Sequence, residues 1–297
     1  MLVLIYLGMY VPVTLALVSF VGVWFIKGNI DVAIGMLSLT ASHSINHFLF
    51  GVIPLFVLMG LLTSAAGMGR DTYQVAHFFL RRVRGGLGIA TVVANAIFAA
   101  ITGVSIASAT VFSRIAVPEM LRFDYQKRFA VGVVAGSSVL GMLIPPSVLL
   151  IIYALVSEQS VGDMFIAGVG PGIVLTIAYT LLILFMAYVT PSKIFNPAAI
   201  ARFGAAESED EELLTWKEVI LKIIPVCVLI LVVLGGIYAG LYTPTEAGAA
   251  GAFCGLLFAL GRRALTLRKF WDILVDTGHV TATLLLLIVA ANMYSRM

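Results

Sequence analysis

Charged side chains are scarce in this sequence. Only 11% of its 297 residues are charged, 61% are hydrophobic, and the mean hydropathy is +1.08. A soluble domain of this length carries about twice that charged fraction, so the composition excludes the soluble class. Apolar runs of roughly 20 residues, long enough to cross a bilayer, recur along the chain. We therefore predict an all-α membrane protein whose transmembrane helices form a single polytopic domain over residues 1–297.

Other absences narrow the function. Tracts rich in Lys or Arg are missing beyond short loop clusters, which argues against nucleic-acid binding. The sequence has no His-Glu-x-x-His motif and no glycine-rich nucleotide loop ending in Lys-Ser or Lys-Thr. Its two cysteines, Cys227 and Cys254, lie in apolar spans and are expected to be small core residues. The apolar start, Met1–Ile26, has no basic region before it, which predicts a first membrane helix rather than a removable signal peptide.

Two basic clusters set the topology. One ends at Arg84 and the other begins at Arg122, and Lys and Arg collect in cytoplasmic loops. The apolar segment between them, residues 86–122, should therefore enter the membrane and return to the same side. Thr102-Gly103-Val104-Ser105 interrupts this segment where the turn is expected. Non-helical backbone at that depth is tolerated only where protein or a water-filled cavity covers it, so this re-entrant hairpin indicates a transport pathway.

The other segments are predicted in the same way. Residues 1–85 should hold the first helices, with an amphipathic helix along the cytoplasmic interface over Arg70–Arg84. Residues 129–190 should hold a broken (discontinuous) helix and the span after it. Residues 191–218 should form a polar cytoplasmic linker, which contains Glu207, Glu209, Asp210, Glu211 and Glu212. Residues 219–297 should begin a second half, with a final apolar segment over Val280–Asn292.

The hairpin tip, Gly103 to Ser108, is the first candidate site. Glycine lets the backbone leave helical geometry, and an unwound tip leaves carbonyls without intrahelical partners beside the hydroxyls of Ser105 and Ser108. Sodium prefers oxygen ligands of this kind, and broken transporter helices supply them. A small-residue packing site is the alternative for this motif alone.

The second candidate site is the break between Gly136 and Ser147. Pro145 and Pro146 have no amide hydrogen to donate to the carbonyls of Gly141 and Met142, so these carbonyls are freed near mid-membrane. Serine hydroxyls add further oxygens, at Ser137, Ser138 and Ser147. A proline kink without a ligand is the alternative, but two breaks in successive segments favour a midplane ion or substrate site.

Titratable side chains are absent from both motifs, which argues against proton coupling and favours sodium. Arg114 and Glu119 lie five residues apart on the hairpin's return arm, and Pro118 is expected to interrupt the helix between them. We therefore predict separate interfacial roles for the two. Glu246 is expected to cap a helix that starts after Thr243 or Thr245.

Two other kinds of site have less support. Ser105 and His279 could form the pair of an intramembrane serine protease, but Ser105 belongs to the hairpin tip and His279 to a cytoplasmic end. His43 and His47 lie four residues apart near the outer face and could bind a metal, although interfacial histidines are the default interpretation. A purely structural membrane scaffold is the remaining alternative.

Several stretches, taken in order, resemble the large permease subunit of tripartite ATP-independent periplasmic (TRAP) transporters, the DctM type. The resemblance covers nearly the whole chain. It rests on residues 53–60 (IPLFVLMG), 84–87 (RGGL), 102–109 (TGVSIASA), 136–138 (GSS), 144–147 (IPPS), 165–172 (FIAGVGPG) and 242–248 (YTPTEAG).

This resemblance implies a sodium-driven, elevator-type secondary transporter of the bacterial inner membrane, not an enzyme, with Na⁺ as coupling ion and no other cofactor. A periplasmic solute-binding protein would deliver small organic anions such as dicarboxylates, keto acids or sugar acids, and a small four-helix membrane subunit would brace the permease. The resemblance maps sodium binding onto Gly103, Val104, Ser105, Ser108, Gly136, Ser137, Gly141 and Pro145. It maps substrate binding onto Ser105, Ser138, Pro146 and Ser147.

The sequence departs from the family pattern twice. Ser108-Ala109-Thr110 stands where many members carry an acidic residue soon after the first hairpin serine. The second, inverted half with its own hairpin and Thr-Pro-Pro-Val-Gly break has no counterpart before Met297. We therefore expect a chain truncated at its C-terminus that does not transport alone. A transporter of another elevator family, which would need no binding protein, is the alternative function.

Overall fold

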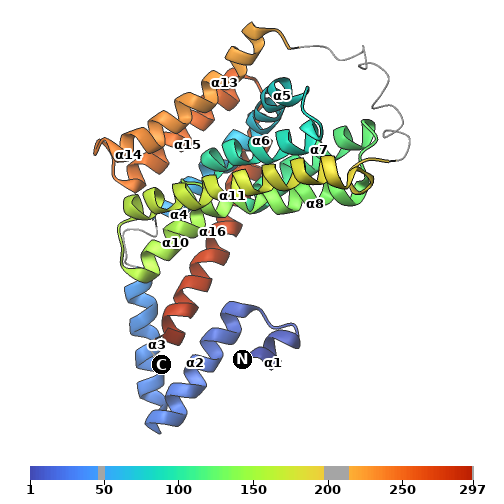
Figure 1. Cartoon of the computed structure of the whole chain (residues 1–297). Coiled ribbons are helices and arrows are strands. Elements are labelled where there is room, and N and C mark those ends of the chain that lie inside the picture. Colours follow the sequence, from blue (N-terminus) through green and yellow to red (C-terminus); the bar gives the residue numbers. More distant parts are fainter. Residues whose placement is uncertain (46–50, 197–213, 296–297) are drawn as a thin grey trace.

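The computed structural model is built from α-helices (Figure 1). It describes residues 1–45, 51–196 and 214–295, and among these no β-strand forms beyond one isolated bridge between Tyr125 and Phe195. The first helices are α1 (Leu2–Tyr6), α2 (Val11–Lys27), α3 (Ile30–Ile45), α4 (Val52–Ala65), α5 (Met68–Leu80), α6 (Gly86–Thr102) and α7 (Ser105–Arg122). Then come α8 (Lys127–Ser138), α9 (Leu140–Leu143), α10 (Val148–Ser157), α11 (Val161–Val189) and η2 (Pro191–Lys193). The last are α13 (Trp216–Ile230), η3 (Leu231–Gly235), α14 (Gly236–Tyr238), α15 (Pro244–Gly261) and α16 (Leu267–Ser295).

Several of these helices suit a membrane. Three are long and apolar enough to cross one, namely α11, α16 and the continuous helix Trp216–Tyr238. Two bent pairs pass the same criteria and raise the number to five if each pair is one span. These pairs are α4 with α5, bent by 63°, and α8–α9 with α10, bent by 42°. The predicted class, an all-α membrane protein with several spans, is confirmed.

The helices form a central body with two flanking groups. In Figure 1, α6, α7, α8 and α11 run through the centre, α13 to α15 (orange) pack along one side, and α2 and α3 (blue) project to one end beside α16 (red). Most of α6 is buried, whereas α11 exposes a row of large apolar side chains that includes Val174, Leu181 and Phe185. In a membrane, such an exposed apolar face contacts lipid.

The first apolar stretch is not the single helix that was predicted. α1 ends at Tyr6, and α2 begins at Val11 with Pro12 in its first turn. Between them Gly8 adopts a φ of +90°, in the left-handed region that favours glycine. Proline suits the first turn of a helix because its missing N–H would be unpaired there anyway. The residues between Tyr6 and Val11 therefore break the helix.

Two further predictions about local structure are wrong. α7 continues through Pro118, because a proline near the end of a helix removes one hydrogen bond and leaves the earlier turns intact. Cys227 is exposed on α13 instead of lying in the core, while Cys254 is partly buried. His279 and the predicted apolar segment Val280–Asn292 both belong to α16, one helix of 29 residues.

Two predictions lie partly or wholly outside the described residues. The five acidic residues of the predicted linker belong to residues 197–213, and only the ends of that linker are described. The candidate metal pair involves His47 and the side chain of His43, which are also outside. Within the part of the chain that is described, no group of three metal-binding side chains occurs.

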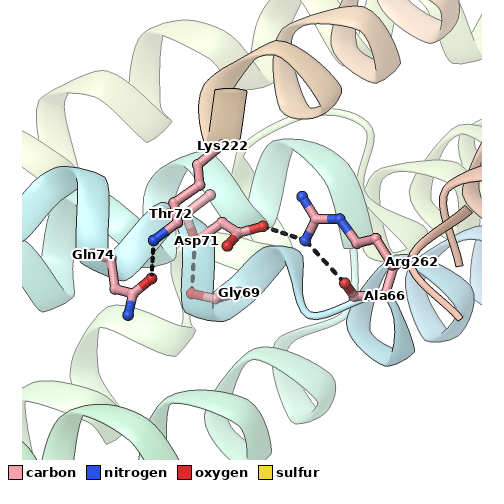
Figure 2. A network of polar contacts seen from close by, with 7 residues as sticks. All are labelled: Ala66, Gly69, Asp71, Thr72, Gln74, Lys222 and Arg262. Atoms are coloured by element: carbon pink, nitrogen blue, oxygen red, sulfur yellow. Dashed lines mark hydrogen bonds and ion pairs between the residues drawn. The ribbon is translucent and has the colours of Figure 1, made fainter. Parts of the chain in front are cut away.

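An ion pair fastens the amphipathic helix α5 to the second half of the chain (Figure 2). Arg262, at the end of α15, pairs with the buried carboxylate of Asp71 and also donates from Nη1 to the carbonyl oxygen of Ala66 at 3.1 Å. Ala66 is the C-cap of α4. One guanidinium therefore holds the bend between α4 and α5. On α13, Lys222 Nζ adds a 2.7 Å hydrogen bond to Gln74 Oε1 of α5.

We expect Arg262→Gln to lower the free energy of unfolding by about 2 kcal/mol. Removing the cation leaves the Asp71 carboxylate in a buried position without its ionic partner, and fully buried pairs lose 3–5 kcal/mol in this way. The expected loss is smaller here because the Arg262 side chain is 32% exposed. Thermal unfolding of the purified chain measures it, with Arg268→Gln as an exposed control. Equal melting temperatures for the two variants would contradict this role of Arg262.

A capping box starts α15. Thr243 is the N-cap, and its hydroxyl oxygen accepts from the backbone N–H of Glu246 at 3.3 Å. The Glu246 carboxylate accepts in return from the backbone N–H and the hydroxyl of Thr243, both at 2.8 Å. The prediction that Glu246 caps a helix is confirmed, with Thr243 as the cap. These hydrogen bonds lower the pKa of Glu246 below its ordinary value of 4.5.

The capping box should make part of the stability dependent on pH. A carboxylate whose pKa is lower in the folded state contributes its full stabilisation of the fold above its unfolded-state pKa. This contribution is lost as the pH falls through the pKa of the folded state. Wild type should therefore be more stable than Glu246→Gln at pH 7, and the difference should vanish in acid. Melting temperatures of both proteins across this range measure the effect. A difference that is the same at all pH values would refute it.

Candidate functional site

The predicted hairpin forms with the predicted bounds. α6 begins at Gly86, α7 ends at Arg122, and the two helices meet at Gly103 and Val104. Gly103 closes α6 with a φ of +62° and donates its N–H to the carbonyl of Ala99 at 2.9 Å, which is how glycine commonly ends a helix. Val104 is extended and leads directly into α7.

The predicted break also forms, between Leu143 of α9 and Val148 of α10. Pro145 has no N–H, so the carbonyl of Gly141 lacks its usual helical donor. The carbonyl of Met142 loses its donor at Pro146 in the same way, but it accepts instead from Ser147 Oγ at 2.8 Å. The Ser147 hydroxyl therefore restores one of the two hydrogen bonds that the prolines remove.

The hairpin tip lies directly against this break. The backbone N–H of Val148 donates to the carbonyl of Gly103 at 3.1 Å. A Cβ atom on Gly103 would lie only 2.2 Å from the Pro146 carbonyl oxygen, and one on Gly141 would lie 3.1 Å from the backbone of Ser105. The two motifs, separate in sequence, thus form one site with no space for a side chain at Gly103 and little at Gly141.

Glycines of two other helices enclose this site. A Cβ on Gly60 of α4 would lie 2.7 Å from the carbonyl oxygen of Thr102, just before the tip. On α11, a Cβ at Gly168 would lie 2.6 Å from the carbonyl oxygen of Leu143, and one at Gly172 would lie 2.7 Å from Ile144. Gly60 of the 53–60 stretch and Gly168 and Gly172 of the 165–172 stretch therefore serve close packing around the tip and the break.

Asn95 of α6 was not predicted and connects the two motifs. Its side chain is fully buried. Ser108 Oγ donates to Asn95 Oδ1, and Asn95 Nδ2 donates to Ser137 Oγ, both at 2.5 Å. Ser137 Oγ donates in turn to the carbonyl of Val133 at 2.7 Å. The sequence did contain a signal for this role, because Asn95 is a lone amide within the apolar stretch 86–101 and a buried amide needs hydrogen-bond partners.

The candidate ligands fall into three groups. Gly103, Val104, Ser105, Gly141, Pro145, Pro146 and Ser147 belong to the contact between tip and break. Ser108 and Ser137 join it through Asn95. Ser138 bonds the Ala135 carbonyl within α8 at 2.8 Å, and Gly136 faces the ring of Tyr179 on α11. Neither of these last two is brought into the contact.

Ser105 differs from the other candidate serines. Ser108, Ser137, Ser138 and Ser147 are buried, and each donates its hydroxyl to a protein oxygen. Ser105 is partly exposed, and its hydroxyl makes no hydrogen bond among the described residues. Of the five, Ser105 is therefore the serine whose hydroxyl is available to a ligand.

The electrostatics of the site come from helix ends. α6 and α9 end here, so they contribute carbonyl oxygens and the negative ends of their dipoles. α7 and α10 begin here, so their first amides have no intrahelical partners, and the amide of Val148 donates instead to the Gly103 carbonyl. Carbonyl oxygens suit a small hard cation, and helix N-termini suit an anion. The arrangement therefore offers groups of both kinds without a charged side chain.

Comparison with known proteins identifies the family of the chain. The family model of the tripartite ATP-independent periplasmic transporter, DctM component, matches residues 1–297. The chain belongs to the DctM family. It is therefore a multi-pass protein of the bacterial inner membrane and not an enzyme, as predicted, and the serine-protease alternative is set aside. Membership also excludes the alternative of a transporter from a different family.

Relatives in this family are named for different substrates. The C4-dicarboxylate TRAP transporter large permease protein DctM of Pseudomonas aeruginosa is 34% identical over 84% of this chain and 56% of its own length. The sialic acid TRAP transporter large permease protein SiaM of Vibrio cholerae is 31% identical over 89% of this chain and 62% of its own length. The ectoine/5-hydroxyectoine TRAP transporter large permease protein UehC of Ruegeria pomeroyi is 29% identical over 99% of this chain and 66% of its own length. The chain thus spans between half and two thirds of each relative.

We expect Asn95→Leu to lower the free energy of unfolding by about 2 kcal/mol. The change leaves buried serine hydroxyls without their amide partner, and an unsatisfied buried polar group costs about 1–3 kcal/mol. Thermal unfolding measures the loss. Ser113→Ala, which removes an exposed hydroxyl bonded to Thr110 on α7, should have little effect. An Asn95→Leu variant as stable as this control would show that the amide does not join the two motifs.

Proposed function

We propose that this chain supplies a sodium and substrate site of a TRAP transporter that takes up small organic acids. The observation that carries the proposal is the contact between the hairpin tip and the broken helix, where Val148 donates to the Gly103 carbonyl at 3.1 Å. This contact gathers two carbonyl ends and two amide ends of helices at one place. Coupled transport needs a cation and an anion to be bound together, and this site offers ligands for both.

Sodium is the coupling ion in this proposal. Its ligands would be backbone carbonyls of the tip and the break, with the carbonyl of Gly141 available because Pro145 cannot donate to it. The hydroxyl of Ser105 would add a side-chain oxygen. Ser108 and Ser137 would position these ligands through Asn95. Sodium, rather than a proton, is supported by the lack of titratable side chains in both motifs.

The substrate would be a small organic anion. The amides that begin α7 and α10 are suited to a carboxylate, and Ser105 lies at the start of α7. Similar relatives are named for C4-dicarboxylates, sialic acid and ectoine. Such variety within one family supports selection of the substrate by a separate periplasmic binding protein. A small four-helix membrane subunit completes the proposed assembly.

An elevator movement suits this site. The glycines at positions 60, 103, 141, 168 and 172 leave no space between the tip, the break and the helices around them. Packing that tight resists sliding of one element past another. The hairpin and the broken helix would therefore move across the membrane as one body, with sodium and substrate enclosed.

The sodium site is tested by hydrogen exchange of the purified chain in NaCl and in KCl at equal ionic strength. We expect sodium to slow the exchange of the amides in residues 101–108 and 140–150, because a bound ion holds the tip against the break. Gly103→Ala should abolish this protection, since alanine in left-handed geometry costs roughly 1–2 kcal/mol and its Cβ would meet the Pro146 carbonyl.

Gly132→Ala is the matched control. A Cβ at Gly132 of α8 meets no atom within 4 Å, so this variant should keep the sodium response. Ser105→Ala should weaken the response by removing one ligand while leaving the fold unchanged. Identical exchange in NaCl and KCl for wild type would refute the sodium site. The substrate proposal is tested separately, by sodium-dependent uptake of a dicarboxylate into liposomes with the binding protein and small subunit supplied.

A further inference from the structure

A basic cavity lies apart from the candidate site. It has a volume of about 1170 Å³ and lies between α5, the second half of α7 and the start of α13. Arg114 is the first α7 residue that lines it, and it lies nine residues beyond Ser105, which is about 14 Å along the helix. The cavity therefore belongs to the opposite end of the hairpin, where the basic clusters that mark the cytoplasmic side lie.

The lining carries an excess of positive charge. Its cationic side chains are Arg70, Arg81, Arg114, Arg122 and Lys222, and its carboxylates are Glu119 and Glu218. Helical spacing accounts for this arrangement, because residues 70, 74, 77, 78 and 81 share one face of α5, and 114, 118 and 122 share one face of α7.

Neither carboxylate neutralises the excess. Glu218 is held by the backbone N–H of Thr215, which it caps at 2.7 Å, and Glu119 lies 3.8 Å from Arg122, at the limit of an ion pair. Among the described residues, Arg70 and Arg114 have no ion pair, and Lys222 bonds only the neutral amide of Gln74, as Figure 2 shows. The cavity is thus suited to an anion.

An aromatic cluster places the rim of the cavity at the membrane surface. Phe78 lines the cavity and packs edge-on against Trp216, with ring centroids 5.1 Å apart, and Phe79 packs on the same ring at 5.9 Å. Trp216 is 62% exposed and begins the spanning helix. Exposed tryptophans of this kind gather at the level of lipid headgroups. One turn further on, α13 exposes Ile220, Leu221 and Ile224, a surface for an acyl chain.

We propose that this cavity binds the phosphate headgroup of an anionic phospholipid from the cytoplasmic leaflet. The arginines and Lys222 would contact the phosphodiester, and the acyl chains would lie along the exposed face of α13. Basic pockets between helices on the cytoplasmic side recognise such headgroups. A lipid held there would brace α5 against α7 and α13, the helices between which the cavity lies. Lipid binding in this cavity does not depend on the transported substrate.

Native mass spectrometry of the purified chain tests the proposal, with titration of phosphatidylglycerol or phosphatidylcholine. Phosphatidylglycerol should bind more tightly. The double variant Arg70→Gln/Arg114→Gln should weaken its binding by roughly 30-fold, the factor that corresponds to about 1 kcal/mol for each basic side chain near an anionic surface. The matched control is Arg82→Gln/Arg263→Gln, which removes two exposed arginines that do not line the cavity, and it should bind phosphatidylglycerol almost as wild type does.

A second variant is expected to bind phosphatidylglycerol more tightly than wild type does. Glu119→Gln removes a carboxylate from the lining, so phosphatidylglycerol should bind several-fold more tightly, a result that misfolding cannot produce. Equal weakening by the two double variants, or no preference for phosphatidylglycerol, would overturn the proposal. Displacement of the lipid by millimolar phosphate or succinate would also overturn it, because the cavity would then serve a soluble anion.

Discussion

The structure depends on one close backbone contact, that of Gly103 with the Pro145–Pro146 break. The contact requires a residue without Cβ in left-handed geometry at the tip. It also requires that the facing segment, Pro145–Pro146, is not helical. Both requirements create unpaired backbone groups inside an apolar body, which would be costly alone. They satisfy each other in part, because Val148 donates to the Gly103 carbonyl and Ser147 donates to that of Met142. The glycines of α4 and α11 then complete the enclosure.

A site made of helix ends also explains why the motifs contain no charge. A charged side chain in the membrane is expensive, whereas helix dipoles bring partial charges of both signs that exist only because the backbone is broken. Carbonyl ends from α6 and α9 lie beside amide ends from α7 and α10. A bound cation would raise the affinity of the site for an anion, and a bound anion would raise its affinity for a cation, because each charge offsets the electric field of the other. In the proposed function, coupling between the two ligands would therefore need no charged side chain.

The sequence was sufficient for features that depend on local chemistry, and insufficient for those that depend on orientation. Basic clusters and one glycine predicted the bounds of the hairpin, and two prolines predicted the break. Asn95 contacts Ser137 across 42 positions, and Arg262 contacts Asp71 across 191. Such partners depend on how helices pack. Cys227 shows a second limit, because lipid and core are both apolar and hydropathy does not distinguish a residue that faces one from a residue that faces the other.

The basic residues that line the cavity between α5, α7 and α13 could serve both as a topological signal and, as we propose, in binding. A topological signal needs positive charge only somewhere in the loops. It does not require Arg70, Arg114 and Lys222, from three different helices, to converge on one cavity beside an exposed tryptophan. Convergence brings like charges together, which is unfavourable unless solvent or an anion offsets it. An anion of the adjoining membrane surface is always present at high local concentration, so the arrangement costs least where that surface supplies the counter-charge.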